Sequence, residues 1–376
     1  MTTSPDTPFA RVDRAKVERN IARLRAHLDA LGVSRRPHVK TSKALEPTAM
    51  IFDGGTGPIT VSTLAEAEFF ADAGYTDILY AVGIAPTKLE RVARLRRRGV
   101  DLTILLDTVA QARAVADFAT EHEESLPVLI EIDTDGHRAG VLPDDPQLLE
   151  IARILTDGGA QARGVMAHAG GSYFATTPQA QCAAAEQERR ATVDAAERLR
   201  TAGHAAPVVS VGSTPTAHAA TDLTGVTEVR AGNVVFFDLV MAGIGVCTID
   251  DVALSVVATV IGRGPDDASI LTDAGWTATS SDRGTGTRAV DQHLGLVTTD
   301  TGGVLPDLLM IGASREHSVL AIRPGVEREL PDLPIGTRVR ILPIHACATA
   351  AQHDHYEVVA GEGKPVTERW QRCHGW

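Results

Sequence analysis

The chain has 376 residues, too many for one ordinary hydrophobic core, so a large domain and a smaller one are expected. Its composition, 44% hydrophobic and 22% charged, is that of a globular protein, and the net charge of −12 without a basic face argues against nucleic-acid binding and favours small-molecule partners. No stretch approaches the roughly 18 apolar residues of a membrane span, no signal peptide is visible, and four scattered cysteines form no disulfide framework, so a cytoplasmic location is expected.

The first two-thirds of the chain alternate helical and strand-like segments in a regular order. A helix is expected over 13–31, followed by a short strand that ends near Lys40 and by a further helical stretch. The next expected strands lie at 59–63, 77–82, 101–107, 126–133, 162–170, 207–216 and 227–238. Among the connections between them, helices are expected at 65–74, 87–99, 108–123, 147–159 and 179–203.

Short apolar strands joined by helical crossovers are typical of a parallel sheet that is covered on both faces. About eight such units within about 230 residues predict a closed (β/α)8 barrel of the TIM type. A doubly wound open sheet is the alternative fold.

The pattern changes after Met241, where short alternating segments punctuated by Gly, Pro and Asp replace the long helices. This texture predicts an α/β barrel followed by a mainly β domain. The expected strands of the β-domain lie at 253–264, 269–275, 293–299, 319–324 and 337–345. We therefore expect the barrel over 12–242 and the β-domain over 1–11 and 243–376.

Only five of the 36 basic residues are lysines, and two of them, Lys40 and Lys43, follow the first expected strand. Arginine cannot replace a lysine that must react as an amine, because a guanidinium stays protonated and forms no Schiff base. Barrel active sites lie at the C-terminal ends of the strands, where Lys40 is expected. Lys40 is therefore the candidate catalytic amine. The alternative is that Lys40 is an ordinary surface lysine that has been retained by chance.

Two other expected strands deliver polar side chains to the same end of the barrel. Arg138 follows the strand at 126–133, and His168 and Tyr173 follow the strand at 162–170. Considered alone, Arg138 would most simply be an ion-pair partner of Asp133 or Asp135, and His168 would be a structural histidine at the barrel mouth. Their shared position at the barrel mouth favours a role in binding instead.

Two loops rich in glycine and hydroxyl groups, 212–216 and 230–233, follow the last two expected strands. Barrels commonly bind a phosphate at this place, because glycine lets backbone amides approach the oxygens and hydroxyls such as those of Ser213 and Thr214 can donate as well. Each loop alone is a weak signal. Together, and facing Lys40 across the mouth, they predict pyridoxal phosphate held as a Schiff base.

The sequence PIHACAT places His345 and Cys347 two residues apart on an expected strand, so both side chains should share one face. Imidazole and thiolate together suit Zn²⁺. A chance pair is about as common as a ligand pair, and the nearby His353 and His355 read as a polar turn. A site with two protein ligands and open positions would suit catalysis.

Eight motifs occur in order along the chain: RPHVKTSK, EIDTDGHRAGV, HAGGSY, GSTPT, EVRAGNVVFFD, DAGWTATSSD, the Glu316–His317 pair and PIHAC. Together they resemble the metal-dependent D-serine dehydratase and D-threonine aldolase family, fold-type III pyridoxal-phosphate enzymes with an alanine-racemase-like fold. The resemblance covers nearly the whole chain. It implies pyridoxal 5'-phosphate and Zn²⁺ or another divalent cation as cofactors, a small D-amino acid as substrate, and a homodimer with shared active sites.

The resemblance also implies roles for individual residues. Lys40 would be the Schiff-base lysine and Arg138 would face the phenolic oxygen of the cofactor. His168 and Tyr173 would line its ring, and either Tyr173 or Arg230 would pair with the pyridine nitrogen. The phosphate would be held by Gly212, Ser213, Thr214, Gly232 and Asn233, and the metal by His345 and Cys347.

The HxC form of the metal motif resembles the dehydratase branch, which converts D-serine, D-threonine or 3-hydroxyaspartate to a 2-oxo acid and ammonia. Ser42, Val234 and Thr277 depart from residues common in the family and leave the preferred substrate open. Retro-aldol cleavage to glycine and an aldehyde is the first alternative. An amino acid racemase or a non-catalytic pyridoxal-phosphate-binding protein is the second. No role is assigned to Glu316, His317, His353 and His355.

Overall fold

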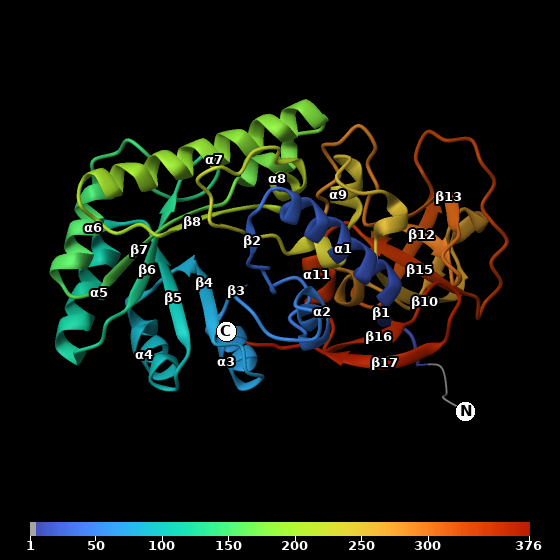
Figure 1. Cartoon of the computed structure of the whole chain (residues 1–376). Helices are drawn as coiled ribbons and strands as arrows, with labels where there is room; N and C mark the ends of the chain where they lie inside the picture. The colour runs from blue at the N-terminus through green and yellow to red at the C-terminus, as the bar shows by residue number, and fades with distance from the viewer. Residues whose placement is uncertain (1–4) are drawn as a thin grey trace. The chain divides into compact units, whose positions relative to one another are not determined.

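A closed parallel barrel forms the first part of the chain in the computed structural model, which describes residues 5–376 (Figure 1). Its strands are β2 (Ser34–Arg35), β3 (Ile59–Val61), β4 (Asp77–Gly83), β5 (Asp101–Leu106), β6 (Pro127–Ile132), β7 (Gln161–Ala167), β8 (Val208–Val211) and β9 (Glu228–Val229). They pair in parallel in the order β2-β9-β8-β7-β6-β5-β4-β3. The segment after β2 closes the ring on β3, because Val39 N donates to Thr60 O at 2.9 Å and Thr60 N donates to Pro37 O at 2.8 Å.

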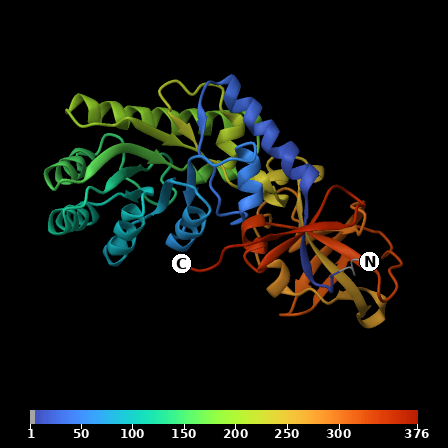
Figure 2. The same ribbon diagram turned by 60° about the horizontal axis from the view of Figure 1, so that its bottom comes forward.

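Helices connect the barrel strands, and α3 to α7 lie along the outside of the sheet (Figures 1 and 2). The helices of this part are α1 (Arg14–Ala30), α2 (Leu45–Ile51), α3 (Leu64–Asp72), η1 (Pro86–Lys88), α4 (Leu89–Arg97), α5 (Val109–His122), α6 (Gln147–Asp157), η2 (Gly170–Phe174), α7 (Pro178–Thr201) and α8 (Thr214–Ala219). Threonine caps start three of them: the hydroxyls of Thr63, Thr108 and Thr177 each accept the amide three residues further on. Such a cap satisfies an amide that has no partner within the helix and stabilises it by about 1 kcal/mol.

Apolar side chains fill both faces of the barrel sheet. Leu79, Leu105, Leu129 and Met166 form a small buried cluster of their own, and a larger buried cluster joins the strands to the helices. Burying each leucine contributes about 1.5–3 kcal/mol. The packed interior holds the strands rigidly, so the loops after them are presented on a fixed frame.

The second part of the chain is a mainly antiparallel β-domain. Its strands are β1 (Phe9–Asp13), β10 (Leu254–Arg263), β11 (Ile270–Thr272), β12 (Gly295–Thr299), β13 (Val304–Ala313), β14 (Ser318–Ile322), β15 (Arg338–Pro343), β16 (His355–Val359) and β17 (Val366–Gln371). They pair in the order β11-β14-β13-β12-β15-β10-β1-β16-β17, and a further β10–β11 pairing closes part of the sheet into a ring around buried side chains such as Val256, Met310 and Ile341. The short helices of this part are η3 (Asn233–Val235), α9 (Leu239–Gly243), η4 (Ile249–Asp251), η5 (Pro265–Asp267), α10 (Trp276–Thr279) and α11 (Ala346–Ala350).

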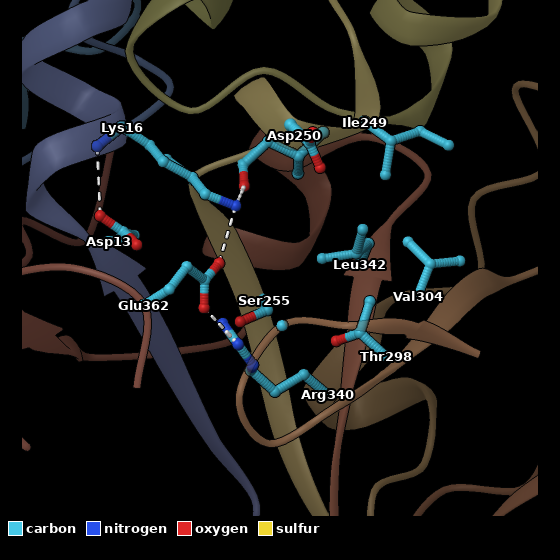
Figure 3. Close-up of a pocket in the computed structure, with 13 residues that line it drawn as sticks. Asp13, Lys16, Ile249, Asp250, Ser255, Thr298, Val304, Arg340, Leu342 and Glu362 are labelled. Carbon is cyan, nitrogen blue, oxygen red and sulfur yellow. Dashed lines mark hydrogen bonds and ion pairs between the residues drawn. The ribbon is translucent and has the colours of Figure 1, made fainter. Parts of the chain in front are cut away.

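Charged side chains that line a small cavity in the β-domain connect the start of α1 to the sheet (Figure 3). Glu362 accepts from Lys16 Nζ at 2.8 Å and also from the guanidinium of Arg340, whose side chain is 5% exposed. Asp13 lines the same cavity and accepts the Lys16 amide at 3.1 Å. The two cations share one carboxylate, so Glu362 is the partner on which the buried Arg340 depends.

The closed barrel with a following β-domain confirms the predicted fold and excludes the open-sheet alternative. Several strand bounds differ. β2 ends at Arg35 rather than near Lys40, because Pro37 has no amide for a ladder and the chain turns after His38. β9 stops at Val229, where the chain bends into the loop before η3. β1, β13, β16 and β17 were not predicted. No helix among residues 5–376 is long and apolar enough to cross a membrane.

Contacts divide the described chain into two compact units. One holds residues 22–232 and 373–376, and the other holds residues up to 21 together with 233–372. The expected boundaries, 12–242 against 1–11 and 243–376, remain a prediction, and residues 1–4 lie outside the described part of the chain.

Candidate active site

Lys40 lies in a tight turn immediately after the segment that closes the barrel. The Lys43 amide donates to Val39 O at 2.8 Å across this turn, and the Lys40 amide faces His38 Nδ1 at 3.4 Å. The turn therefore continues from the closing hydrogen bonds of the barrel, and the backbone of Lys40 is held at the carboxyl end of the parallel strands.

Lys43 has a structural partner. Its ammonium lies 2.7 Å from Oε1 of Glu66, a carboxylate that is fully buried and also accepts from the amide and hydroxyl of Ser62. Lys43 O in turn accepts the amide of Cys373 at 2.7 Å. The lysine that the sequence left without a role thus neutralises a buried charge beneath the turn that carries Lys40.

The two histidines of the barrel mouth are uncharged at neutral pH. His168 Nδ1 donates to Gly212 O at 3.1 Å, which leaves its Nε2 as an acceptor. Burial, with Lys40 and Arg230 as neighbouring cations, lowers the pKa of His168 to about 3. Burial and the same cations lower the pKa of His38 well below its ordinary value. Arg138 also lowers the pKa of His168 electrostatically, so it is the fourth predicted residue near this site, with Lys40, His168 and Arg230.

Arg230 is buried and its guanidinium is held rigidly. It donates to Ser210 Oγ at 2.6 Å and to the carbonyl of Ala167. The ring of Tyr173, the other predicted partner of the pyridine nitrogen, lies with its centroid 6.4 Å from that of His168. The choice between Arg230 and Tyr173 therefore stays open as a prediction.

Arg138 pairs with neither aspartate considered from the sequence. Its guanidinium lies 3.5 Å from Glu131 Oε1, on a side chain that is 60% exposed against 8% for Glu131. Asp133 instead accepts the amides of Asp135 and Gly136 and shapes the loop after β6. A weakly held, exposed guanidinium remains able to turn toward a ligand.

The predicted phosphate loop after β8 is tightly built. Gly212 has φ of +134°, and a Cβ there would lie 2.1 Å from Arg230 O, so only glycine fits. Ser213 caps α8 and forms a capping box with Thr216. The Gly212 amide points inward to Glu188 at 3.0 Å and the Ser213 amide to Thr216 Oγ1 at 3.0 Å.

The Gly212 amide is therefore occupied within the protein, and the assignment of Gly212 to the phosphate stays a prediction. The Thr214 amide has no acceptor within the described residues, and it is the donor of this loop that remains for a ligand. In the neighbouring loop a Cβ on Gly232 would lie 2.6 Å from His38 O, which again restricts the position to glycine.

Asn233 belongs to the unit that contains the β-domain. Its Nδ2 donates to Asp238 Oδ2 at 2.6 Å, whereas its buried Oδ1 has no partner in the described structure. Asp238 is fully buried and accepts the amides of Met241 and Ala346 as well, both at 2.9 Å. One carboxylate thereby connects the Asn233 loop to the segment that carries His345 and Cys347.

The metal-motif residues do not lie on a strand, which corrects the prediction. β15 ends at Pro343, His345 stands at the N-cap position of α11 without a side-chain cap bond, and Cys347 lies in the first turn, because the apolar ACATA continues as a helix. The two side chains still interact directly. Burial alone would lower the pKa of His345, but its hydrogen bonds to Asp282 and Cys347 raise it to about 11.

Asp282 orients the imidazole. Its Oδ2 lies 3.1 Å from His345 Nδ1, so a metal would bind at Nε2 and displace the proton there, as in the carboxylate–histidine–metal arrangements of many sites. No group of three His, Cys, Asp or Glu side chains suited to a metal occurs between residues 5 and 376.

The residues left without a role lie in structural positions. His353 Nε2 donates to Ala278 O at 2.8 Å, and His355 faces Glu357 at 3.3 Å. Glu316 accepts the hydroxyl of Thr277 at 3.0 Å, and His317 follows it in the turn between β13 and β14.

Sequence reasoning missed His38, Glu188, Asp238 and Asp282. His38, Asp238 and Asp282 stand inside or at the end of recognised motifs, which is a usable signal. Glu188 lies in the middle of a long helix rich in charged residues, and nothing in the sequence distinguishes it.

A parallel barrel with a lysine, two neutral histidines and two arginines at its mouth, followed by an antiparallel β-domain, defines the alanine-racemase-like class of pyridoxal-phosphate enzymes. The family model of the alanine racemase N-terminal domain matches residues 12–240, and that of a putative serine dehydratase domain matches residues 253–359. The chain belongs to the D-serine dehydratase and D-threonine aldolase family of fold-type III enzymes, as its motifs indicated.

Three relatives span nearly the whole chain. The D-threo-3-hydroxyaspartate dehydratase of Delftia sp. (strain HT23) is 54% identical over 99% of this chain and 98% of its own length. Its solved structure is 53% identical, covers 99% of this chain and 98% of the solved chain, and has a TM-score of 0.95. The D-serine dehydratase of Dictyostelium discoideum is 31% identical, covering 96% of this chain and 95% of the relative. The D-threonine aldolase of Arthrobacter sp. is 28% identical, covering 94% and 89%.

Two further solved structures concern variants of a D-threo-3-hydroxyaspartate dehydratase. One has a histidine replaced by alanine, and the other, described as a metal-free form, has a cysteine replaced two positions further on. His345 and Cys347 have the same spacing in this chain.

Proposed function

We propose that this lyase dehydrates D-β-hydroxy amino acids to a 2-oxo acid and ammonia, with D-threo-3-hydroxyaspartate as the first substrate to test and D-serine and D-threonine after it. The observation that carries the proposal is the 54% identity to a D-threo-3-hydroxyaspartate dehydratase over 99% of the chain. The metal pair His345 and Cys347, supported by Asp282, agrees with it.

The residues at the barrel mouth fit pyridoxal phosphate. Lys40 supplies an amine at a strand end, the Thr214 amide lacks an acceptor, and the glycines of both loops keep the backbone close. When bound, this cofactor acidifies the Cα–H bond of an amino acid and accepts the electron pair that is left. We assign Lys40 to hold the cofactor and to receive the Cα proton.

The neighbours of Lys40 follow from their charges. His38 and His168 are uncharged, so they add no repulsion toward the Lys40 ammonium and leave Arg230 as the fixed buried cation. Arg138 is assigned to the phenolic oxygen, where a mobile cation can follow a shift in charge. His168 and Tyr173 are assigned to the ring.

The pair of His345 and Cys347 fits a borderline-soft divalent cation, with Zn²⁺ as the first choice. When bound, such a metal acts as a Lewis acid on an oxygen and so makes hydroxide a better leaving group. In this assignment Asp282 fixes the tautomer of His345 that leaves Nε2 free.

Product analysis tests the reaction. Purified protein loaded with pyridoxal phosphate and Zn²⁺ should convert D-threo-3-hydroxyaspartate to oxaloacetate and ammonia in equal amounts, and D-serine to pyruvate and ammonia. Glycine and glyoxylate from the first substrate would show retro-aldol cleavage instead. Full activity after exhaustive chelation would refute the metal assignment.

Retro-aldol cleavage is the second candidate, because the D-threonine aldolase relative covers 94% of this chain. The same experiment distinguishes the two reactions by their products. A homodimer with shared active sites and a cytoplasmic location are further parts of the proposal, supported by the family resemblance, and light scattering of the purified protein tests the first.

A further inference from the structure

Glu188 is a buried carboxylate on the inner side of α7, with 2% of its surface exposed. Both of its oxygens are occupied. Oε1 accepts the amides of Ala169 and Gly212, each at 3.0 Å, and Oε2 accepts the hydroxyl of Thr216 at 2.7 Å. A buried carboxylate is costly unless it is fully hydrogen-bonded, so a chain that keeps one here depends on these three bonds.

The three donors belong to two separate loops. Ala169 follows β7, beside His168, whereas Gly212 lies in the loop after β8 that is assigned to the cofactor phosphate, and Thr216 lies in the first turn of α8, which continues that loop. A second bond joins the same loops, because the hydroxyls of Ser172 and Ser213 lie 2.8 Å apart. Glu188 therefore fixes the distance between the loop that carries His168 and the loop after β8.

The carboxylate also determines where the hydroxyl protons point. Thr216 Oγ1 donates its single hydroxyl proton to Glu188 Oε2 at 2.7 Å. The proton of Ser172 is directed to Ala169 O at 2.6 Å. Thr216 Oγ1 and Ser172 Oγ then have only lone pairs to offer to Ser213, so the Ser213 hydroxyl donates its proton to one of them, at 2.8 Å to Ser172 or at 3.0 Å to Thr216. The Thr214 amide is therefore the donor of this loop that remains for a ligand.

We propose that Glu188 is a positioning residue for the phosphate of the cofactor. It acts through Gly212 and Thr216, which hold the loop in the shape that presents the Thr214 amide as a donor. The inference rests on the proposed use of pyridoxal phosphate and adds to it a residue that does not touch the cofactor.

Comparing pyridoxal phosphate with pyridoxal tests this role, because the two ligands differ only in the phosphate. Dissociation constants are measured by equilibrium dialysis of full-length protein freed of cofactor. Glu188→Met keeps the side-chain volume and removes the acceptors, and it should weaken pyridoxal phosphate about tenfold or more while leaving pyridoxal unchanged, as expected when one charge-assisted contact to the phosphate is lost.

Two further substitutions separate geometry from charge. Glu188→Gln keeps one oxygen for both amides and should retain binding within about threefold, since the Gln amide can donate to Thr216. Glu188→Asp keeps the charge but withdraws it by about 1.5 Å, one C–C bond, and should weaken pyridoxal phosphate more than Gln does. The Asp variant also serves if the Met variant fails to fold.

Glu186→Gln is the matched control, because Glu186 lies on the same helix and pairs with Arg189 and Arg190 at the surface. It should leave both ligands unaffected. Glu188 variants that bind pyridoxal phosphate like the unmodified protein, or that lose pyridoxal to the same extent, would overturn the inference alone. Unmodified protein that takes up no pyridoxal phosphate would overturn the proposed function and this inference with it.

Discussion

Replacing Asp282 by asparagine should weaken metal binding at His345 and Cys347 without unfolding the β-domain. Asp282 has two tasks, since Oδ2 contacts His345 Nδ1 at 3.1 Å and Oδ1 accepts the Gly284 amide at 2.7 Å. Asparagine has one acceptor oxygen and can serve only one of them. Because the backbone bond shapes the local turn, we expect the contact with His345 to be the one that is lost.

The magnitude follows from the exposure of the pair. A charge-assisted hydrogen bond contributes about 1.5–3 kcal/mol when shielded from water. The side chains of His345 and Asp282 are 41% and 29% exposed, so solvent screening favours the lower end of that range. A loss of about 1.4 kcal/mol is tenfold in affinity, the lower limit for outer-shell partners of metal ligands.

Competition with a chromophoric chelator measures the Zn²⁺ affinity directly and needs no activity. Asp332→Asn is the control, because Asp332 is a 93% exposed carboxylate of the same part of the chain. Equal Zn²⁺ affinity of the Asp282→Asn variant and the unmodified protein would refute the assigned role of Asp282. Unchanged Zn²⁺ affinity after Cys347→Ala would refute the site itself.

Three further predictions concern the barrel mouth and the β-domain. Lys40→Ala should abolish turnover and the visible absorbance of bound pyridoxal phosphate. Lys43→Ala should retain that absorbance but lower the melting temperature, because it leaves the buried carboxylate of Glu66 without its cation. Loss of the absorbance in both variants would contradict the separate roles of the two lysines. Gly212→Ala should abolish cofactor binding, because a Cβ there would lie 2.1 Å from a backbone oxygen; dialysis against pyridoxal phosphate measures this, and normal uptake would show that the loop adapts. Burial alone would raise the pKa of Glu362, but hydrogen bonds from Arg340 and Lys16 lower that pKa below its ordinary value. The ionised Glu362 therefore contributes its full stability above the unfolded-state pKa of about 4.3, and this contribution is lost as the pH falls through the folded-state pKa. Urea unfolding of Glu362→Gln should therefore show a deficit of about 1–2 kcal/mol at pH 7, reduced because a third of the side chain is exposed, and the deficit should shrink below about pH 4; a deficit that does not depend on pH would contradict the ion-pair explanation.

The sequence predicted those features that depend on local periodicity. Apolar strands alternating with helices predicted the barrel, and the barrel then predicted that Lys40, Arg138 and His168 would meet at one end. These three do gather, since each of the other two influences the pKa of His168. Nothing in that reasoning required knowledge of side-chain packing.

The features that were missed depend on contacts between distant segments. The alternating PIHACAT reads as the end of a strand, but Pro343 ends β15 and the following alanines favour a helix. β17 (VTERWQ) was overlooked because polar side chains interrupt its apolar positions. Glu188 owes its role to partners 19 to 28 positions away and Asp282 to a partner 63 positions away, and no local pattern contains that information.

The shared carboxylate of Asp238 has a consequence for protein engineering. Asn233 and Ala346 both donate to the same oxygen, so a change that moves one donor alters the acceptor available to the other. The effects of substitutions in the Asn233 loop and in the segment of His345 and Cys347 should therefore not add, although more than a hundred positions separate them in sequence. Variants intended to change the metal or the substrate are best selected from libraries that vary both segments together.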